Sequence, residues 1–349
     1  MIQAKIIGAG GYGGVGITEL LLKHPKIDIA SLVSLSDTGR LMSDVFPHLK
    51  GYCDKIILSP DDPRTNEAYD LVIYATPDKV SMETAGDEIK KGAKVIDYSG
   101  DFRFNSIKRY KNYANFLGKD SSHKAPELLN ISEYGLTEIH EINEKNNLIG
   151  NPGCFAISCI LALAPAVKSK IIDPDTIICD CKTGISGAGK KPNASFHYPN
   201  RYDNMNAYRL DGHQHLVEIE QELGLLANKD LKITFTAQAV PLCRGIMSVC
   251  YADIKDINIT DAIKIYNDFY SNQQFIRILE KNVSSSISDV RSTNYCNLVV
   301  DIDERTQKLR IISHIDNLMK GQAGNAMQVI NHMFGFNSNT ALDTFGQYP

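Results

Sequence analysis

Short apolar runs alternate with helical segments along the first hundred residues. The predicted strands are residues 4–7, 27–34, 71–75 and 94–97, and the predicted helices are residues 17–22 and 81–91. Strands with nearly continuous apolar cores, separated by helices, are typical of a parallel sheet that is covered on both faces. This pattern predicts an α/β fold in which the first domain, residues 1–150, contains a doubly wound parallel sheet.

The pattern changes after residue 150. An apolar run of helical length follows Cys154, and strands are predicted at residues 177–182, 233–240, 247–254, 297–301 and 309–314. We expect a mostly antiparallel sheet in an α+β domain over residues 151–316. Residues 183–192 and 196–209 are predicted loops. A helix is predicted to begin after His215, with Glu218 and Glu222 expected on its outer face, and another helix begins near Asn317 and continues to about Phe334.

Length, charge and cysteine content narrow the class of protein. A chain of 349 residues suggests two domains, and a net charge of −4 without a basic stripe argues against nucleic-acid binding. No secretory signal or membrane-spanning stretch is predicted. The eight cysteines form no CxxC pair, so their spacing indicates neither a zinc site nor a disulfide framework. Cys179 and Cys181 are expected to be packing residues. A reducing, cytoplasmic location fits best.

A glycine-rich stretch follows the first predicted strand and opens a helix. Gly8, Gly10 and Gly13 satisfy G-x-G-x-x-G, and Gly8, Gly11 and Gly14 satisfy a looser G-x-x-G-x-x-G. Glycines there allow a tight turn and the close approach of a pyrophosphate. A glycine-rich turn without a ligand is the alternative, but the position between a strand and a helix favours nucleotide binding. Residues 1–150 are therefore predicted to form a Rossmann-type nucleotide-binding domain.

The residues after the second and third strands indicate which cofactor binds. Ser34, Ser36 and Arg40 suit a ribose 2′-phosphate and therefore predict NADP, whereas Asp37 is the type of residue that holds the 2′-hydroxyl of NAD. Thr76-Pro77 ends the third strand, where a doubly wound sheet binds its ligand.

Two further segments offer candidate site residues. In 97–104, at a strand's carboxyl end, Arg103 could bind a phosphate or carboxylate bidentately, or could pair with Asp101. Asn151-Pro152-Gly153 is a tight bend that places Cys154 in the first turn of a helix. Such a position favours the nucleophilic thiolate, although a free cysteine is also a common core residue.

His213 and His215 come directly before a predicted helix, whose apolar positions include Val217 and Leu223. Either histidine could be a helix cap or a core residue. A metal pair would need a third ligand, and none lies nearby, so no metal site is predicted. The remaining possibility is that one of the two histidines exchanges protons with a substrate bound to Cys154.

Motifs along the whole chain resemble the N-acetyl-gamma-glutamyl-phosphate reductase family, in the aspartate-semialdehyde dehydrogenase-like superfamily. They are the glycine loop with Tyr12 and Gly14, residues 97–104, Tyr134-Gly135-Leu136, Asn151-Pro152-Gly153-Cys154, Ser186-Gly187-Ala188-Gly189, Gly212-His213-Gln214-His215 with residues 218–222, Arg244-Gly245-Ile246, and residues 316–324. Two departures are Leu35 and Gln214, which stand where family members usually have arginine.

The resemblance implies roles for these residues. Cys154 would be the nucleophile and His215, or else His213, the acid/base. Ser186, Gly187, Ala188 and Gly189 would lie against the nicotinamide, and a C-terminal helix, residues 317–349, would complete the cofactor domain with Asn317 near the cofactor. Ser99, Arg103, Asn151 and Arg244 are expected to contact the substrate. The second domain would also mediate dimerisation, giving a homodimer or homotetramer.

The implied reaction is NADPH-dependent reduction of N-acetyl-gamma-glutamyl phosphate, a small acyl phosphate, through a cysteine thioester, in arginine biosynthesis. A related sub-branch that reduces carrier-protein-bound aminoadipyl or glutamyl phosphates shares most of the motifs, and aspartate-semialdehyde dehydrogenase is a further alternative. A non-enzymatic NADP sensor would not need the cysteine, and a cysteine-dependent hydrolase would not need the glycine loop.

Overall fold

The fold is taken from a computed structural model of the chain, which describes residues 1–347. The chain forms two compact units. Unit 1 consists of Met1–Lys111, Ser121–Pro152 and Gln322–Asp343, and unit 2 consists of Asn112–Asp120, Gly153–Gly321 and the described residues from Thr344 onward. The Asn-Pro-Gly turn therefore ends in unit 2, while its first two residues belong to unit 1.

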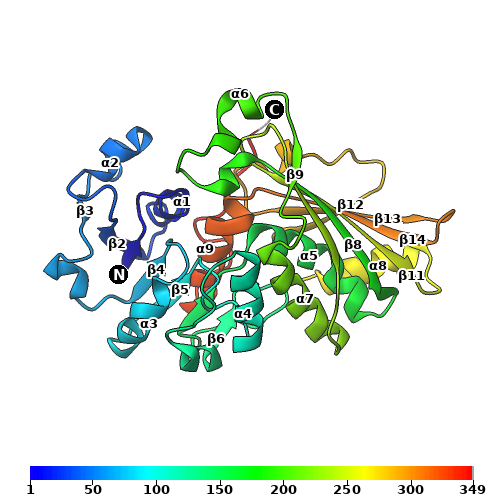
Figure 1. Ribbon diagram of the computed structural model, residues 1–349, viewed down its shortest axis with the longest axis horizontal. Coiled ribbons are helices and arrows are strands. Elements are labelled where there is room, and N and C mark those ends of the chain that lie inside the picture. The colour runs from blue at the N-terminus through cyan, green and yellow to red at the C-terminus, as the bar shows by residue number, and fades with distance from the viewer. Residues whose placement is uncertain (348–349) are drawn as a thin grey trace. The chain divides into compact units, whose positions relative to one another are not determined.

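Unit 1 contains a seven-stranded sheet in the order β3-β2-β1-β4-β5-β7-β6 (Figure 1). Its strands are β1 Ile2–Ile7, β2 Ile27–Val33, β3 Ile57–Leu58, β4 Leu71–Tyr74, β5 Lys94–Asp97, β6 Ser132–Tyr134 and β7 Leu148–Gly150. Every neighbouring pair is parallel, which confirms the expected Rossmann-type sheet. The strand order reverses between β1 and β4, and ligands bind at the carboxyl ends of strands at such a reversal.

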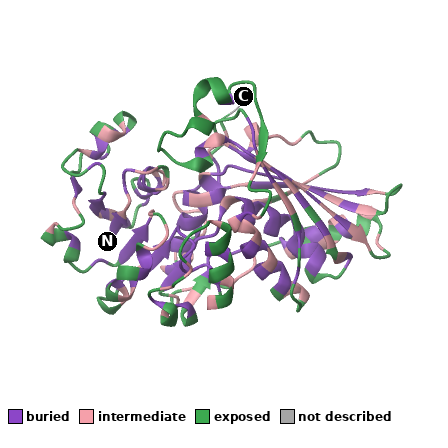
Figure 2. Cartoon of the chain, in the orientation of Figure 1, coloured by how far each residue is buried: buried purple, intermediate pink, exposed green. Residues whose placement is uncertain are grey.

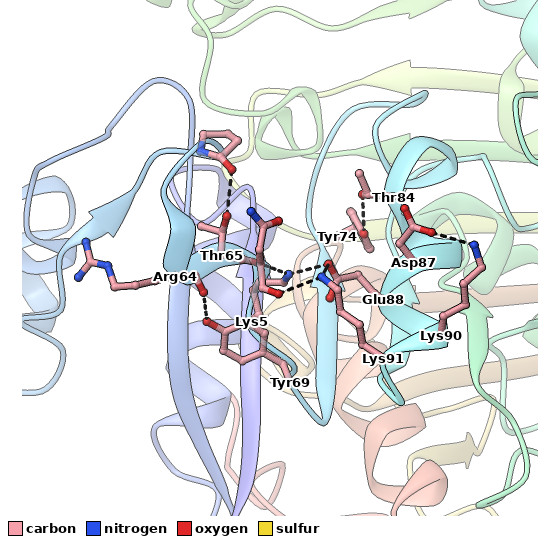
Figure 3. A network of polar contacts seen from close by, with 12 residues as sticks. Lys5, Arg64, Thr65, Tyr69, Tyr74, Thr84, Asp87, Glu88, Lys90 and Lys91 are labelled. Carbon is pink, nitrogen blue, oxygen red and sulfur yellow. Dashed lines mark hydrogen bonds and ion pairs between the residues drawn. The ribbon is translucent and has the colours of Figure 1, made fainter.

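An ion pair buried inside unit 1 ties β1 to the neighbouring elements (Figure 3). Lys5 Nζ lies 2.9 Å from Glu88 Oε1 and donates to the Thr65 carbonyl at 2.9 Å. Burial lowers the pKa of Lys5, and the carboxylate of Glu88 opposes that shift. Removing Glu88 would leave the buried charge of Lys5 without its carboxylate partner, which is strongly destabilising.

Unit 2 contains a second seven-stranded sheet in the order β12-β13-β14-β11-β8-β10-β9. Its strands are β8 Ile172–Thr183, β9 Asn206–Tyr208, β10 Thr234–Ala239, β11 Ile246–Ile254, β12 Ile276–Leu279, β13 Cys296–Asp303 and β14 Lys308–Ile315. The β8/β10 and β12/β13 pairs are parallel and the other neighbours are antiparallel. The sheet is thus mixed but mostly antiparallel, as the sequence predicts.

The helices cover these two sheets. The α-helices are α1 Tyr12–Leu21, α2 Met42–Val45, α3 Ser81–Lys90, α4 Ile107–Phe116, α5 Cys154–Lys168, α6 Tyr198–Arg201, α7 Gln214–Ala227, α8 Ile259–Phe269 and α9 Gly324–Met333. Short 3-10 turns are η1 Pro47–Leu49, η2 Pro63–Asn66, η3 Pro126–Asn130, η4 Ile185–Ala188, η5 Ala194–Phe196 and η6 Ile287–Asp289, and η7 Met319–Ala323 is a π turn.

Helix α5 is the core of unit 2. Every residue from Phe155 to Val167 is buried, and the helix packs against β8, β11, β14, α7 and α8 (Figure 2). A helix that is apolar all round can only be stable when it is enclosed in this way. Its first residue, Cys154, is held at the end of a rigid, fully packed element.

Three sequence predictions are wrong in detail. Residues 196–209 are not one loop but include α6 and β9. The helical segment formed by η7 and α9 ends at Met333, as expected from the predicted end at about Phe334, but a C-terminal helix over all of 317–349 is wrong because the following described residues, to 347, form no helix. The last two residues of that prediction, 348–349, lie outside the described residues.

The third error concerns α7. Glu218 and Glu222, expected on its outer face, have exposed fractions of 0% and 1%. Helix α7 packs on α5, and Glu218 Oε2 accepts a hydrogen bond from the Gly153 N–H at 2.9 Å. A carboxylate can be buried when a polar group of the protein replaces its water.

Candidate active site

Cys154 is the first residue of α5, and Gly153 is the residue that caps this helix. The N–H groups of the first turn have no partner within the helix, and together with the helix dipole they favour a negative charge. Cys154 is half-buried, whereas the other cysteines of unit 2, Cys243 excepted, are buried. The local fold therefore favours a thiolate that a small molecule can reach.

The ring of His215 lies against Gly153, next to Cys154. A Cβ atom at position 153 would come 2.2 Å from His215 Nε2. Any residue other than glycine at position 153 would therefore push the imidazole of His215 away from its position. Glycine is required here for close packing and not for backbone freedom, since its φ of −73° is accessible to every residue.

His213 lies in a different environment from His215. Its Nδ1 accepts the His215 backbone N–H at 3.2 Å and so caps α7. The rings of Phe155, Tyr208 and Phe235 surround it at centroid distances of 5.5, 5.7 and 5.3 Å. Burial, helped by the charge of Arg209, lowers the pKa of His213 to about 3. At neutral pH this histidine is uncharged, with its proton on Nε2.

Unit 2 has a cavity of about 400 Å³ beside the nucleophile. Cys154, His213, Gln214, His215 and Tyr208 are among the residues that line it. Burial, and then the charge of Cys154, raise the pKa of Tyr208, so the phenol and the thiol interact electrostatically. A cavity of this volume with a few polar groups is typical of a small-molecule site.

The glycine-rich segment after β8 reaches the same cavity. Gly187 and Ala188 line it, whereas Ser186 and Gly189 are not among its lining residues. Asn317 holds this segment, because its Nδ2 donates to Ser186 Oγ at 2.9 Å and its Oδ1 accepts the Gly245 N–H at 2.7 Å. Asn317 therefore positions the segment within unit 2.

Arg244, a predicted substrate contact, is ion-paired. Its Nη2 lies 3.0 Å from Asp316 Oδ2, and Asp316 itself is buried. Asp316 also accepts the Ser292 N–H at 2.7 Å. Arg244 is not among the described residues that line the cavity.

In unit 1 the glycine loop forms a cradle at the start of α1. Gly8 has φ +90°, and a Cβ there would lie 2.3 Å from the Ala75 carbonyl oxygen. A Cβ on Gly14 would lie 2.4 Å from the Gly8 carbonyl oxygen. Gly10, Gly11 and Gly13 complete the loop, Tyr12 begins α1, and Thr76 and Pro77 follow β4. This close packing and the free N–H groups of α1 fit the pyrophosphate of a dinucleotide.

The residues after β2 surround Asp37. Ser36 Oγ donates to Asp37 Oδ2 at 2.8 Å, and Arg40 Nη1 lies 3.4 Å from Asp37 Oδ1. Ser34 is buried, and its Oγ lies 3.4 Å from that of Ser36. Leu35 has an exposed fraction of 85%.

The other predicted substrate contacts of unit 1 form a buried scaffold. Arg103 Nε donates to the Asn151 carbonyl at 2.8 Å, and Asn151 Oδ1 accepts from Asn325 Nδ2 at 2.8 Å. Ser99 Oγ donates to Asp97 Oδ2 at 2.7 Å. Burial, followed by the nearby Asp101, raises the pKa of Asp97 to about 7. These contacts hold the first residue of the Asn-Pro-Gly turn.

The lining residues that sequence reasoning missed include two arginines and a tyrosine: Arg201, Arg209 and Tyr208. Arg201 is buried and donates to the Ala239 carbonyl at 3.1 Å and to Asn206 Oδ1 at 2.7 Å. Arg209 donates to Gln214 Oε1. The available signal was the presence of two arginines and a tyrosine in the segment before the histidine pair. This segment was predicted to be a loop, and its cationic residues were therefore not considered as part of a site.

Comparisons with known proteins match both units. The semialdehyde dehydrogenase NAD binding domain matches residues 3–146, and the semialdehyde dehydrogenase dimerisation domain matches residues 154–317. No helix among residues 1–347 is long and apolar enough to cross a membrane.

The chain is similar over its full length to several N-acetyl-gamma-glutamyl-phosphate reductases. It is 37% identical to that of Geotalea daltonii, with 100% of both chains covered, and 40% identical to that of Caldicellulosiruptor saccharolyticus, again with 100% of both covered. The protein of Bacillus cereus is 39% identical over 99% of this chain and 100% of its own.

Solved structures share the fold at low sequence identity. Aspartate semialdehyde dehydrogenase II of Vibrio cholerae, complexed with ASA, has a TM-score of 0.70 and 15% identity, covering 96% of this chain and 98% of its own. Aspartate semialdehyde dehydrogenase with NADP from Candida albicans has a TM-score of 0.65 and 16% identity, covering 97% and 99%.

Proposed function

The chain belongs to the N-acetyl-gamma-glutamyl-phosphate reductase family of semialdehyde dehydrogenases, and from this premise we propose that it reduces N-acetyl-gamma-glutamyl phosphate to N-acetylglutamate semialdehyde and phosphate. Arginine biosynthesis is the corresponding pathway. The observation that carries the proposal is the nucleophile: Cys154 begins a buried helix, and the ring of His215 packs on the preceding glycine.

The chemistry requires one thiolate and one proton donor. Cys154 Sγ attacks the acyl carbon, the carbon–sulfur bond forms, and the bond to phosphate breaks to leave a thioester. The nicotinamide cofactor, when bound, supplies the hydride. His215 gives a proton to the resulting oxyanion and accepts it again as the carbon–sulfur bond breaks and the aldehyde leaves. His213 keeps α7 capped and remains neutral throughout.

The charge of the substrate fits the cavity. Acyl phosphates of this class carry a phosphate and a carboxylate, and Arg201 and Arg209 are among the residues that line the cavity. Arg201 already donates to several protein oxygens, so we assign the carboxylate contact to Arg209, which binds the side chain of Gln214. Ser99, Arg103, Asn151 and Arg244 remain the proposed substrate contacts.

We further propose NADPH as the reductant. Ser34, Ser36 and Arg40 stand at the carboxyl end of β2, and Arg40 Nη1 is near enough to Asp37 to offset its negative charge. The match of residues 154–317 to a dimerisation domain supports a homodimer or homotetramer, which analytical ultracentrifugation would measure. All eight cysteines are free, which supports a cytoplasmic location.

The decisive assay follows NADPH absorbance with N-acetylglutamyl phosphate, and with the semialdehyde and phosphate in the reverse direction. Cys154→Ser should abolish turnover but retain NADPH binding, while Cys296→Ser, a buried thiol outside the cavity, should remain active. Turnover only with a carrier-bound aminoadipyl or glutamyl phosphate would show that the chain has the substrate of the carrier-dependent sub-branch. Turnover only with aspartyl phosphate would show that it is an aspartate-semialdehyde dehydrogenase. NADPH binding without any turnover would indicate a sensor, and phosphate release without NADPH oxidation a hydrolase.

A further inference from the structure

Four of the eight cysteines meet in the buried layer between α5 and the sheet of unit 2. Cys179 and Cys181 alternate along β8 and so face the same side of the sheet. Cys250 of β11 pairs directly with Cys179 across the two strands. Cys159 lies on α5, the helix that packs on both strands. None of these four side chains is exposed to solvent.

The sulfur atoms are close enough to share one ligand. Those of Cys159, Cys179 and Cys250 all lie within 4.8 Å of one another. The Cys179 and Cys250 sulfurs are 3.7 Å apart, and Cys181 Sγ lies 3.5 Å from Cys159 Sγ. Two sulfurs that bind one tetrahedral Zn²⁺ at about 2.3 Å are about 3.8 Å apart. A disulfide would need about 2.05 Å, and all four thiols are free.

We propose that Cys159, Cys179 and Cys250 form a binding site for a soft divalent metal ion such as Zn²⁺, with Cys181 within reach as a fourth sulfur. The site offers sulfur and no oxygen ligand among these residues, which selects against Mg²⁺ and Ca²⁺. The short sequence spacing typical of zinc sites is absent, because the ligands come from α5, β8 and β11.

Binding leaves the layer without a net charge. Two thiols lose their protons to solvent, two metal–sulfur bonds replace two sulfur–hydrogen bonds, and the third sulfur binds as a neutral thiol. No electron is transferred. A divalent ion with two thiolates is neutral, so the large cost of burying a net charge in an apolar layer does not arise.

The ion would join α5 to the sheet. Cys159 lies on the same helix as Cys154, which is that helix's first residue, and Cys179 and Cys250 lie on the two strands that α5 covers. Binding of the ion to the folded state raises the unfolding temperature. Any affinity of the unfolded chain's thiols for the ion makes this rise smaller. Because the four thiols are buried, the ion must enter while α5 is loosened from the sheet, and it should then exchange slowly.

The test uses full-length protein that carries Cys154→Ser and Cys243→Ser, which removes the two thiols that are not buried. Cd²⁺ is the probe, added to the reduced protein during mild warming and followed by desalting. We expect one Cd²⁺ per chain, a thiolate-to-cadmium absorption band and a higher unfolding temperature. Adding Cys250→Ala should reduce the retained Cd²⁺ at least tenfold.

Cys296→Ala in the same background is the matched control. Cys296 is buried in the same sheet, but its sulfur contacts the Ser313 hydroxyl at 3.5 Å and is not one of the three clustered sulfurs. This variant should retain Cd²⁺. Equal retention by the Cys250→Ala variant, or no retention by the background protein, would overturn the proposal. If the Cys250→Ala variant does not fold, X-ray absorption on the cadmium-loaded background protein decides: three or four sulfur neighbours support the site, and oxygen or nitrogen neighbours alone reject it.

Discussion

At the scale of single residues, two histidines of one short motif have separate tasks. The Nδ1 atom of His213 is occupied by the His215 backbone N–H, and aromatic rings enclose its imidazole. The imidazole of His215 is half-buried, lines the cavity and packs on the glycine before Cys154. The first arrangement suits a helix cap and the second an acid/base.

His215→Asn should therefore lower kcat by about 10²–10⁴-fold with a smaller change in KM, because a general acid acts mainly as the oxyanion forms. His213→Asn should mainly lower the unfolding temperature, since it disturbs the helix cap and the ring packing. Steady-state kinetics and thermal melts of the two variants measure both effects. A severe loss of kcat at His213 with a mild one at His215 would reverse the assignment, and equal modest losses would assign the proton to water.

At the scale of elements, the contact between α5 and α7 depends on a buried carboxylate. Glu218 accepts the N–H of Gly153, the cap of the helix that begins with Cys154. Glu218→Ala removes the acceptor and leaves a buried N–H unpaired, which costs about 1–3 kcal/mol of unfolding free energy. We also expect kcat to fall, because the turn beside the nucleophile loses its anchor.

Glu218→Gln is the matched control for this contact. Its amide oxygen can still accept the Gly153 N–H, so most of the stability and of kcat should be retained. Denaturant unfolding and steady-state kinetics of both variants measure the difference. A glutamine variant that is as impaired as the alanine variant would show that the negative charge, and not the hydrogen bond to Gly153, is what matters.

The carboxyl end of β2 sets the cofactor preference in our proposal. Arg40 is the residue that we expect to bind the 2′-phosphate, so Arg40→Asp should weaken NADPH much more than NADH, by about 10–100-fold for a lost charge-assisted hydrogen bond. Leu35 is 85% exposed, so Leu35→Arg should fold normally and increase the preference for NADPH. The ratio of kcat/KM for the two cofactors tests both variants. A parent enzyme that uses NADH as well as NADPH would contradict the assignment.

At the scale of the whole molecule, buried histidines make stability depend on pH. Burial lowers the pKa of His213 to about 3 and, despite the opposing charge of Asp289, that of His314 to about 4. The unfolded chain binds a proton at each site near pH 6.5, whereas the folded chain does so only at much lower pH. Each site therefore stabilises the fold fully above pH 6.5, and this contribution is lost as the pH falls toward the folded pKa.

His314→Asn should remove one such contribution, and His314 is not among the described residues that line the cavity. Between pH 6 and 4.5, the stability of the parent should fall relative to the variant by up to about 1.4 kcal/mol per pH unit. The parent must be compared with the variant at each pH, because the raised pKa of Asp97 makes both proteins more stable as the pH falls and so opposes the effect of the histidines. His197→Asn, at an exposed position, is the control and should show no such trend. Parallel pH dependence of parent and His314→Asn would contradict the prediction.

Local patterns in the sequence were sufficient for the features that depend on neighbours along the chain. Apolar runs determine the parallel strands β1, β2, β4 and β5 of unit 1, and glycine at position 8 allows the left-handed turn before α1. The Asn-Pro-Gly bend and the apolar run after it place Cys154 at a helix start. Each of these depends on sterics and periodicity within about a dozen residues, which a single sequence contains.

Only the tertiary structure decided which surfaces are covered and which distant residues meet. The burial of Glu218 depends on the packing of α7 on α5. The spacing of apolar residues along α7 does not reveal that the face carrying Glu218 is also covered. Cys159 meets Cys250 across 91 positions because a helix folds back on a strand pair. Arg209 joins the cavity through a short β9 strand that the loop-like composition conceals. Contacts of this kind follow from the packing of whole elements, and their free energy is not encoded in any one segment.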